Sequence, residues 1–220
     1  MNLTQAVFFD LKAASLVDLK VWFDKFTANK NLIFCPTDTV FGVLCTDKNK
    51  IYEAKNRNYN IPLQILGHRN YFFKLFNGYQ NEARDLLIEN FWPGGLSIVC
   101  DSSIGRECFR EPNHKFLLSL LEDVYEPVFA SSLNVSGQSE LWDRDDILRF
   151  AQSLDTPVLV LHEPKEKNLA STVIDLKKDG TFFVIKFLRV GDISKEKILQ
   201  VLSQKFLVHQ KEIDLFELQV

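Results

Sequence analysis

The chain has 220 residues, of which 46% are hydrophobic, and this composition excludes a disordered chain and is ample for the core of one domain. Its formal net charge of −3 argues against a protein whose main task is to grip a nucleic-acid backbone. The four cysteines show no C-x-x-C spacing, and no apolar segment approaches the roughly 20 residues that a bilayer requires. We therefore expect a cytoplasmic protein that is not embedded in a membrane.

Helical and strand-like segments alternate along the chain. Apolar side chains at three- and four-residue spacings predict an amphipathic helix over 14–30 with Ser15 as its N-cap, and Asp47 is expected to cap a helix over 48–56. Further helices are predicted over 71–91 with a break at 77–78, over 114–121, after Asp143 and after Ser194. Strands are predicted at 32–35, 40–45, 63–66, 96–100, 127–130, 158–161, 172–176 and 182–187, and residues 101–111 are predicted to form a turn and a short strand.

The order of these elements predicts an α+β fold with α/β-type layering. The turn at 178–180 is typical of a hairpin, and a hairpin prevents a purely parallel sheet. We expect a mixed, twisted sheet with helices on its faces. The sequence shows no internal repeat or long linker, so we expect one domain over residues 1–204 and a C-terminal appendage over residues 205–220.

Residues 35–57 contain the first candidate site. An apolar run ends at Thr37-Asp38-Thr39, and the helix that follows delivers Lys55 and Arg57 two positions apart. On a helix these two cations would point about 200° apart, whereas in an extended segment they share a side. Because the helix is expected to end here, the cations can converge, and two convergent cations suit a triphosphate. The alternative is a solvated helix C-terminus, where Lys and Arg are common.

A second candidate site follows the predicted strand at 127–130. Ser132 and Asn134 lie in a polar, turn-forming run, and in extended geometry their hydroxyl and amide point the same way. A plain loop that uses Ser, Asn and Gly for turn chemistry is the alternative. Arg106, Arg110 and Arg189 lie beside predicted strands, where each faces either a pocket or solvent.

Several common signatures are missing from the sequence. The four histidines lack metal-ligand spacing, so we predict no metal site built from side chains. The sequence also contains no G-x-G-x-x-G, no G-x-x-x-x-G-K-[ST] and no G-x-S-x-G motif.

Eight short motifs nevertheless occur in one characteristic order. They are Pro36-Thr37-Asp38-Thr39-Val40-Phe41-Gly42, Lys55-x-Arg57, Pro62-Leu63, Trp92-Pro93-Gly94, Arg110-x-Pro112, Ser132-Leu133-Asn134-Val135-Ser136-Gly137, Ser171-Thr172-Val173-Ile174-Asp175 and Arg189-x-Gly191. Through these motifs the chain resembles the YrdC/Sua5 family of threonylcarbamoyl-AMP synthases, in its single-domain YrdC-like form, over residues 14–204. The resemblance implies a YrdC/RibB-like twisted mixed sheet.

The resemblance also implies a reaction and a set of site residues. The reaction joins L-threonine, bicarbonate or CO2, and ATP into threonylcarbamoyl-AMP and pyrophosphate, and Mg2+ would bridge the triphosphate. Separate transferase proteins then modify tRNA next to the anticodon, and direct tRNA binding would be weak. By this resemblance ATP is held by Lys55, Arg57, Ser132, Asn134 and Arg189, threonine by Thr37 or Thr39, Arg110 and Ser171, and Lys55 and Arg57 are catalytic.

Two other functions remain open at this stage. Some proteins of this fold are regarded as RNA-binding or ribosome-associated, and in such a protein the cationic pocket would hold an RNA phosphate. The negative net charge favours the synthase. A carbamoyl-adenylate site that serves another acceptor, as in hydrogenase maturation proteins, is disfavoured because acylphosphatase and zinc-finger segments are missing from the sequence.

Overall fold

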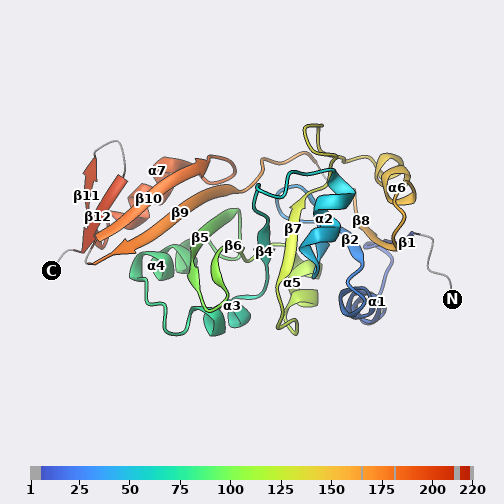
Figure 1. Cartoon of the computed structure of the whole chain (residues 1–220), viewed down its shortest axis with the longest axis horizontal. Coiled ribbons are helices and arrows are strands. Elements are labelled where there is room, and N and C mark those ends of the chain that lie inside the picture. The colour runs from blue at the N-terminus through green and yellow to red at the C-terminus, as the bar shows by residue number, and fades with distance from the viewer. Residues whose placement is uncertain (1–5, 165, 181, 211–213, 219–220) are drawn as a thin grey trace.

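The computed structural model describes residues 6–164, 166–180, 182–210 and 214–218, and its strands form one long mixed sheet (Figure 1). In their order across the sheet, the strands are β1 (Val7–Asp10), β8 (Val158–His162), β2 (Leu32–Pro36), β3 (Phe41–Cys45), β7 (Val128–Ser132), β4 (Gln64–Leu66), β6 (Gly105–Arg110), β5 (Leu96–Ser102), β9 (Thr172–Asp179), β10 (Phe182–Arg189), β12 (Asp214–Leu218) and β11 (Phe206–Gln210).

The sheet combines parallel and antiparallel pairs, as the hairpin signal predicted. Strands β8, β1 and β2 are parallel neighbours, and so are the pairs β4–β6 and β5–β9. The pairs β2–β3, β3–β7, β4–β7, β5–β6 and β9–β10 are antiparallel. The predicted hairpin at 178–180 joins β9 to β10, with Asp179 opposite Phe182.

Seven helices lie in the described part of the chain. They are α1 (Leu16–Ala28), α2 (Lys48–Lys55), α3 (Arg69–Phe76), α4 (Glu82–Phe91), α5 (Lys115–Leu121), α6 (Arg144–Gln152) and α7 (Lys195–Leu202). The four N-caps predicted from the sequence are confirmed, because the side chains of Ser15, Asp47, Asp143 and Ser194 each accept a hydrogen bond from a first-turn amide. The predicted break at Asn77-Gly78 separates α3 from α4, and Gly78 adopts φ 85°.

The strands near the N-terminal end of the sheet are covered by helices on both faces. In β2, Leu32 and Phe34 pack with α2 and α6, whereas Ile33 and Cys35 pack with α1 and α5. Successive side chains of a strand point to opposite faces, so a strand that is covered twice must be apolar throughout. This explains the unbroken apolar run that begins at Leu32.

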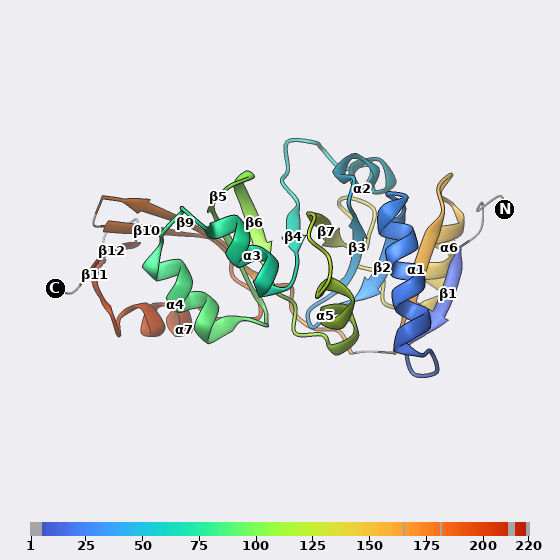
Figure 2. The ribbon, with the colours of Figure 1, turned by 90° about the horizontal axis from the view of Figure 1, so that it is seen from below.

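The other half of the sheet is covered by α3, α4 and α7, and Figure 2 shows α3 and α4 in the same row as α5 and α1. Its strands alternate, with Ile65, Ile98, Phe109 and Ile174 facing these helices. Their neighbours along each strand face the opposite side of the sheet. That side, which we call the open face, carries the polar residues described below.

Three strands were not predicted from the sequence. Strand β1 pairs with β8 at one end of the sheet, and β12 and β11 extend it beyond β10 at the other. The last two lie in the segment expected to be an appendage, and the buried ring of Phe206 makes an edge-to-face contact with Phe183 at 5.2 Å between ring centres. Among the described residues, no helix has the length and apolar character to cross a membrane.

Candidate functional site

A pocket opens on the open face of the sheet, where polar residues from several strands meet. Its walls are formed by Thr39, Val40, Arg57, Pro62, Leu63, Gln64, Val99, Cys108, Arg110, Ala130, Ser131, Ser132, Ala170, Ser171, Val173, Leu188 and Arg189. Six of the nine side chains predicted from the sequence are in this wall. The other three, Thr37, Lys55 and Asn134, lie behind it.

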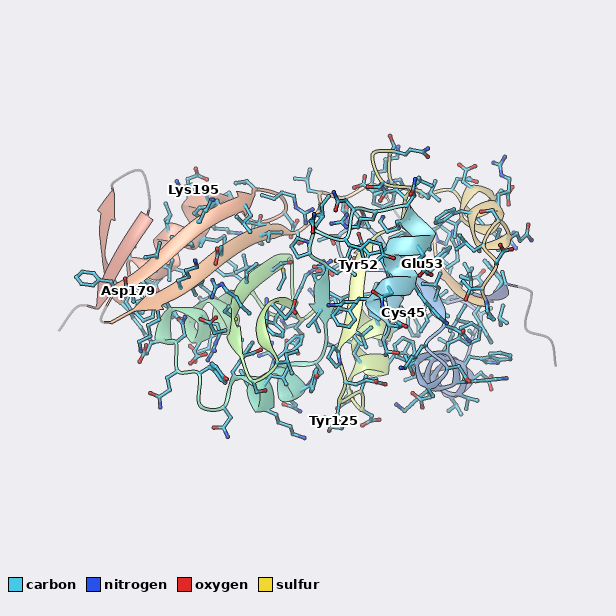
Figure 3. All side chains as sticks on the ribbon, viewed as in Figure 1. Cys45, Tyr52, Glu53, Tyr125, Asp179 and Lys195 are labelled. Carbon is cyan, nitrogen blue, oxygen red and sulfur yellow. The ribbon has the colours of Figure 1, made fainter. Side chains whose placement is uncertain are left out.

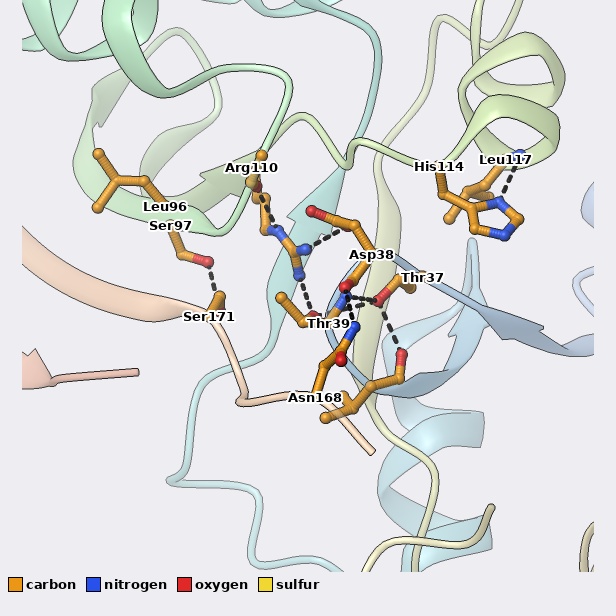
Figure 4. A network of polar contacts seen from close by, with 12 residues as sticks. Thr37, Asp38, Thr39, Leu96, Ser97, Arg110, His114, Leu117, Asn168 and Ser171 are labelled. Carbon is orange, nitrogen blue, oxygen red and sulfur yellow. Dashed lines mark hydrogen bonds and ion pairs between the residues drawn. The ribbon is translucent and has the colours of Figure 1, made fainter. Parts of the chain in front are cut away.

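Arg110 is the most enclosed of the three arginines in the pocket, with 1% of its surface exposed. Its guanidinium donates from Nε to Gly94 O at 2.9 Å and from Nη1 to Thr39 Oγ1 at 2.9 Å, and its Nη2 pairs with the carboxylate of Asp38 (Figure 4). The chain therefore balances the charge of Arg110 itself. We call Asp38, Thr39 and Arg110 the Arg110 cluster.

Hydrogen bonds within residues 37–40 stabilise the corner before β3. Thr37 Oγ1 donates to Val40 O at 2.7 Å, accepts from Thr39 N at 3.1 Å and lies 3.1 Å from Thr39 Oγ1. Asn168 Nδ2 donates to Asp38 O at 3.0 Å from the segment before β9 (Figure 4). Thr37 is 3% exposed, so it shapes the corner from behind while Thr39 faces the pocket.

An ion pair between the buried Glu111 and the half-buried Arg69 lies next to Arg110 in the chain. Glu111 is 1% exposed and accepts hydrogen bonds from Arg69 N and Arg69 Nε, each at 2.7 Å. The backbone carbonyl of Glu111 also accepts from Gly94 N at 2.9 Å, and Gly94 O in turn accepts from Arg110. The orientation of the Arg110 guanidinium is thus set by a loop that this pair holds in place.

Arg57 and Arg189 form the second cationic region of the pocket. Arg57 donates only to backbone carbonyls, Ile61 O at 3.4 Å and Pro62 O at 3.2 Å, and Arg189 donates to Ser171 O at 2.9 Å and Ser171 Oγ at 3.0 Å. Within the described part of the chain, neither makes an ion pair. Burial lowers the pKa of both guanidinium groups, yet arginine stays charged at neutral pH.

The loop that carries Arg57 is held by two tyrosines. Tyr52 projects from α2 (Figure 3), stacks on Tyr59 with 4.6 Å between ring centres, and donates its hydroxyl to Ile61 O at 3.0 Å. Asn56 ends α2 in the left-handed conformation, with φ 48° and ψ 47°. The helix thus ends between Lys55 and Arg57, as predicted, and the two side chains take different directions.

Lys55 turns away from the pocket and is 1% exposed. Its Nζ donates to Ser132 O, to Asn134 O at 2.7 Å and to Asn134 Oδ1 at 2.8 Å. Burial and then the nearby charge of Arg57 lower the pKa of Lys55 to about 7. The three oxygen acceptors match the three protons of an ammonium group. Lys55 therefore shapes the loop that presents Ser132, while Arg57 lines the pocket.

Asn134 also has an internal role. Its Oδ1 accepts from Lys55 and, at 2.7 Å, from Ser132 Oγ, while its Nδ2 donates to Val135 O at 2.9 Å and Gln138 O at 2.8 Å. Three of the five residues that the family resemblance assigns to ATP are thus joined in one unit, in which Ser132 faces the pocket and Asn134 and Lys55 support it.

Gly191 of the last motif and Gly95, which follows the Trp92-Pro93-Gly94 motif, allow the chain to approach itself closely beside the pocket. A Cβ on Gly191 would lie 2.0 Å from the backbone atom Ala170 O, so only glycine fits at that position. A Cβ on Gly95 would lie 2.2 Å from Asp192 Oδ2, so a larger residue there would have to displace the Asp192 side chain. These contacts hold the segment that carries Arg189 against the segment that carries Ser171.

Two residues, Asp38 as the partner of Arg110 and Gln64 in the pocket wall, were given no role in the sequence analysis. Asp38 is part of the Thr37–Thr39 motif, where a carboxylate between two hydroxyls is itself a signal. Gln64 is the one polar residue of the strand Gln64–Leu66 and lines the pocket. Polar residues inside a short apolar run are the signal that could have identified it.

No carboxylate is present in the pocket wall, and the described residues contain no group of three or more His, Cys, Asp or Glu side chains that could hold a metal ion. The wall thus offers no carboxylate ligands for Mg2+. It fits a Mg2+ ion that would arrive bound to phosphate oxygens and water. Cys108 lines the pocket, and burial raises the pKa of its thiol to about 12, so it is a neutral packing group.

Solved structures share this architecture. The fold matches that of a Pyrococcus abyssi Sua5 variant with a TM-score of 0.74 and 24% identity over 89% of this chain, and that of Escherichia coli YciO with a TM-score of 0.68 and 19% identity over 88%. The match spans 60% of the Sua5 chain and 98% of YciO. The protein therefore has the mixed-sheet fold of the Sua5 and YciO proteins.

Sequence comparisons agree with the fold. A family model for Sua5, YciO and YrdC proteins, described as telomere recombination, matches residues 25–191. A provisionally named threonylcarbamoyl-AMP synthase of Mycobacterium tuberculosis (strain H37Rv) is 30% identical, with 78% of this chain and 83% of the relative covered. A threonylcarbamoyl-AMP synthase of Bacillus subtilis is 28% identical over 76% of this chain and 52% of its own length. The chain belongs to the Sua5/YciO/YrdC family.

Proposed function

We propose that this chain is an L-threonylcarbamoyladenylate synthase, a nucleotidyltransferase that forms threonylcarbamoyl-AMP and pyrophosphate from L-threonine, bicarbonate or CO2, and ATP. The observation that carries the proposal is the division of the pocket into a charge-balanced Arg110 cluster and an unbalanced pair of arginines. A zwitterion suits the first region and a polyphosphate suits the second. The names of the relatives from M. tuberculosis and B. subtilis point to the same reaction.

Threonine would lie against the Arg110 cluster. Its carboxylate would accept hydrogen bonds from Arg110, and its hydroxyl would bond to Thr39 or Ser171, with Thr37 keeping the corner in place. Asp38 lies beside Arg110 and supplies the charge that an α-ammonium group needs. A solved Sua5 structure from P. abyssi is described as a complex with L-threonine, and the chain shares the fold of that protein.

ATP would occupy the region of the other two arginines. Arg57 and Arg189 would bind the triphosphate, Ser132 would line the site beside it, and Asn134 and Lys55 would keep Ser132 in place. Mg2+ would bridge phosphate oxygens and reduce their charge. Because the reaction brings anions together, the main catalytic effect of these residues would be positioning and electrostatic stabilisation.

The chemistry requires no covalent intermediate with the protein. The threonine ammonium group loses a proton to solvent, and the amine nitrogen attacks the carbon of CO2. The adduct then loses a second proton to solvent and becomes a carbamate. A carbamate oxygen then attacks the α-phosphorus of ATP, and the bond from that phosphorus to the β-bridging oxygen breaks, so pyrophosphate leaves with the electron pair. Arg57 would stabilise the negative charge that gathers on the phosphoryl oxygens, and Lys55 would act through the loop that it supports.

The test is release of pyrophosphate from ATP by the purified chain, with threonine, bicarbonate and Mg2+ each left out in turn. We expect release only when all are present, and we expect serine and valine to support less of it than threonine. If no amino acid stimulates release, or if all do so equally, the proposal is wrong. A binding protein for RNA phosphate would instead retain an RNA oligonucleotide without consuming ATP.

The product would pass to further proteins. We propose that transferase proteins carry the threonylcarbamoyl group to the adenosine next to the anticodon of tRNA, and that any contact of this chain with tRNA is weak, in keeping with its net charge of −3. Its four cysteines are buried and the described residues show no disulfide, which suits work in the cytoplasm.

A further inference from the structure

Gln64 lies at the centre of the pocket floor. It belongs to β4, and β4 is paired on one side with β7, which carries Ser132, and on the other with β6, which carries Arg110. Its register partners are Cys108 and Ala130, which also line the pocket. The side chain therefore lies between the strand assigned to ATP and the strand assigned to threonine.

A chain of hydrogen bonds sets the orientation of the Gln64 amide. Arg189 Nη2 donates to Ser171 Oγ at 3.0 Å, Ser171 Oγ lies 2.9 Å from Ser97 Oγ, and Ser97 Oγ donates to Gln64 Oε1 at 3.1 Å. Ser97 Oγ is the donor in both of its contacts, and because a hydroxyl carries one proton, it donates either to Gln64 Oε1 or to Ser171 Oγ at any moment. The contact with Ser97 places the Gln64 carbonyl oxygen toward β5 and the amide nitrogen away from it.

This orientation of the amide leaves the Gln64 nitrogen for a ligand. Among the described residues, no buried side-chain nitrogen or oxygen lacks a hydrogen-bond partner, and the structure shows no protein acceptor for Gln64 Nε2, so this atom lies at the surface of the pocket. It offers two uncharged donors. The three arginines in the same wall offer only charged ones.

We propose that Gln64 Nε2 donates to the carbonyl oxygen of the carbamoyl group that joins threonine to AMP, and that Ser97 is the residue that positions it. The inference rests on the proposed function, because only in that product does one carbon link the two ligands. The carbamoyl oxygen is uncharged in the product and carries part of the negative charge in the carbamate. A neutral donor can hold it in both states without trapping the carbamate as an ion pair.

The pocket residues on either side of Gln64 support this assignment. Arg110 and Thr39 are placed for the amino acid, and Arg57 and Arg189 for phosphates, which leaves the one-carbon unit without a partner among the arginines. The hydrogen bonds also connect the two regions, because Ser97 contacts both Gln64 and Ser171, and Ser171 accepts from Arg189.

The experiment compares steady-state pyrophosphate release by the wild-type chain, Gln64→Met and Gln200→Met, with ATP, threonine and bicarbonate varied in turn. Methionine keeps the length of glutamine and removes both donors, and Gln200 is an exposed glutamine on α7 that provides a matched control. We expect kcat to fall about tenfold in Gln64→Met, which is the effect of one lost hydrogen bond. The KM for ATP should change less than about twofold, and Gln200→Met should equal the wild-type chain.

Ser97→Ala provides a second measurement that does not depend on Gln64→Met folding. Ser97 is fully buried and does not line the pocket, so its removal frees the Gln64 amide to rotate without touching a ligand. We expect kcat to fall about threefold with an unchanged KM for ATP, and we expect Ser97→Thr to restore it.

The outcomes separate the two proposals. An active wild-type chain whose kcat is unchanged in Gln64→Met, or in a folded Ser97→Ala when Gln64→Met does not fold, overturns the role of Gln64 and leaves the proposed function intact. A wild-type chain that shows no threonine-dependent release overturns the proposed function and this inference with it. Loss of ATP affinity alone in Gln64→Met would place the side chain at the nucleotide and would also overturn the inference.

Discussion

The two cationic regions of the pocket are built from the same side chain in opposite ways. Arg110 is buried, and the chain satisfies it with a backbone carbonyl, a hydroxyl and the carboxylate of Asp38. Arg57 and Arg189 donate only to neutral oxygens and make no ion pair in the described part of the molecule. The Arg110 cluster is therefore electrically balanced without a ligand, whereas the other region gains its counter-charge when an anion binds.

This difference separates stability from activity. A buried charge that loses its partner destabilises the fold strongly, because it cannot return to water. A cation at the pocket surface that loses its ligand remains hydrated, so its removal has little effect on folding. Substitutions in the Arg110 cluster should thus affect unfolding, and substitutions in the Arg57 and Arg189 region should affect catalysis. The predictions below test this separation, in order of decreasing effect.

Arg57→Ala should show the largest change. We expect threonine-dependent pyrophosphate release to fall about 100-fold or more, because a donor to the developing phosphoryl charge is lost. The midpoint of thermal unfolding should stay close to that of the wild-type chain. Arg149→Ala is the matched control, since Arg149 on α6 is 74% exposed. Near-normal turnover in Arg57→Ala would show that Arg57 has no role in the reaction.

Asp38→Asn should reduce stability rather than turnover alone. The change leaves the buried charge of Arg110 without a counter-ion, and we expect the free energy of unfolding to fall by about 3 kcal/mol. Unfolding in urea measures this free energy. In Asp146→Asn, the exposed partner of Arg149, the fall should be below about 1 kcal/mol. If the two substitutions prove equally mild, the Arg110 cluster is not balanced by Asp38.

Lys55→Met should combine both effects at smaller size. Three oxygens lose their donor, so we expect the free energy of unfolding to fall by about 2 kcal/mol. Because the loop that presents Ser132 loses its support, the KM for ATP should rise about fivefold. The KM for threonine should stay unchanged. Lys178→Met serves as the control, because Lys178 pairs with Glu82 at the surface. A rise in the KM for threonine alone would contradict the supporting role of Lys55.

Salt should distinguish the two regions without any substitution. Raising potassium chloride from about 50 to about 200 mM screens the attraction of the unpaired arginines for a polyphosphate, and we expect the KM for ATP to rise about threefold at constant free Mg2+. Threonine is a zwitterion at a balanced cluster, so its KM should change less than about 1.5-fold. Equal changes in both constants would show that the two regions do not differ in net charge.

Much of the architecture could be predicted because it depends on local patterns. Residues such as Ser15 and Asp47 act within one helical turn, and the alternation in β4 or β9 is set by the two-residue period of a strand. The strand β1 was not predicted because a run of four residues shows too little periodicity. Strands β11 and β12 pair with β10 and with each other, so their existence depends on partners rather than on their own pattern.

The candidate site divides in the same way. The sequence by itself determined the family, since Thr37, Arg57, Ser132 and Arg189 lie in motifs whose order is typical of it. It could not determine which motif residues line the pocket and which support it. Lys55 and Arg57 are two positions apart, yet the left-handed Asn56 between them sends one side chain into the interior and the other to the pocket.

Only the tertiary structure decided the charge balance of the pocket. Asp38 meets Arg110 from 72 positions away, and Gln64 reaches Ser97, Ser171 and Arg189 across three strands of one sheet. The physical reason is that an ion pair or a hydrogen bond depends on distance in space, whereas motif order records only distance along the chain. The sequence thus determined which groups the site contains, and the folded sheet determined which of them remain available to a ligand.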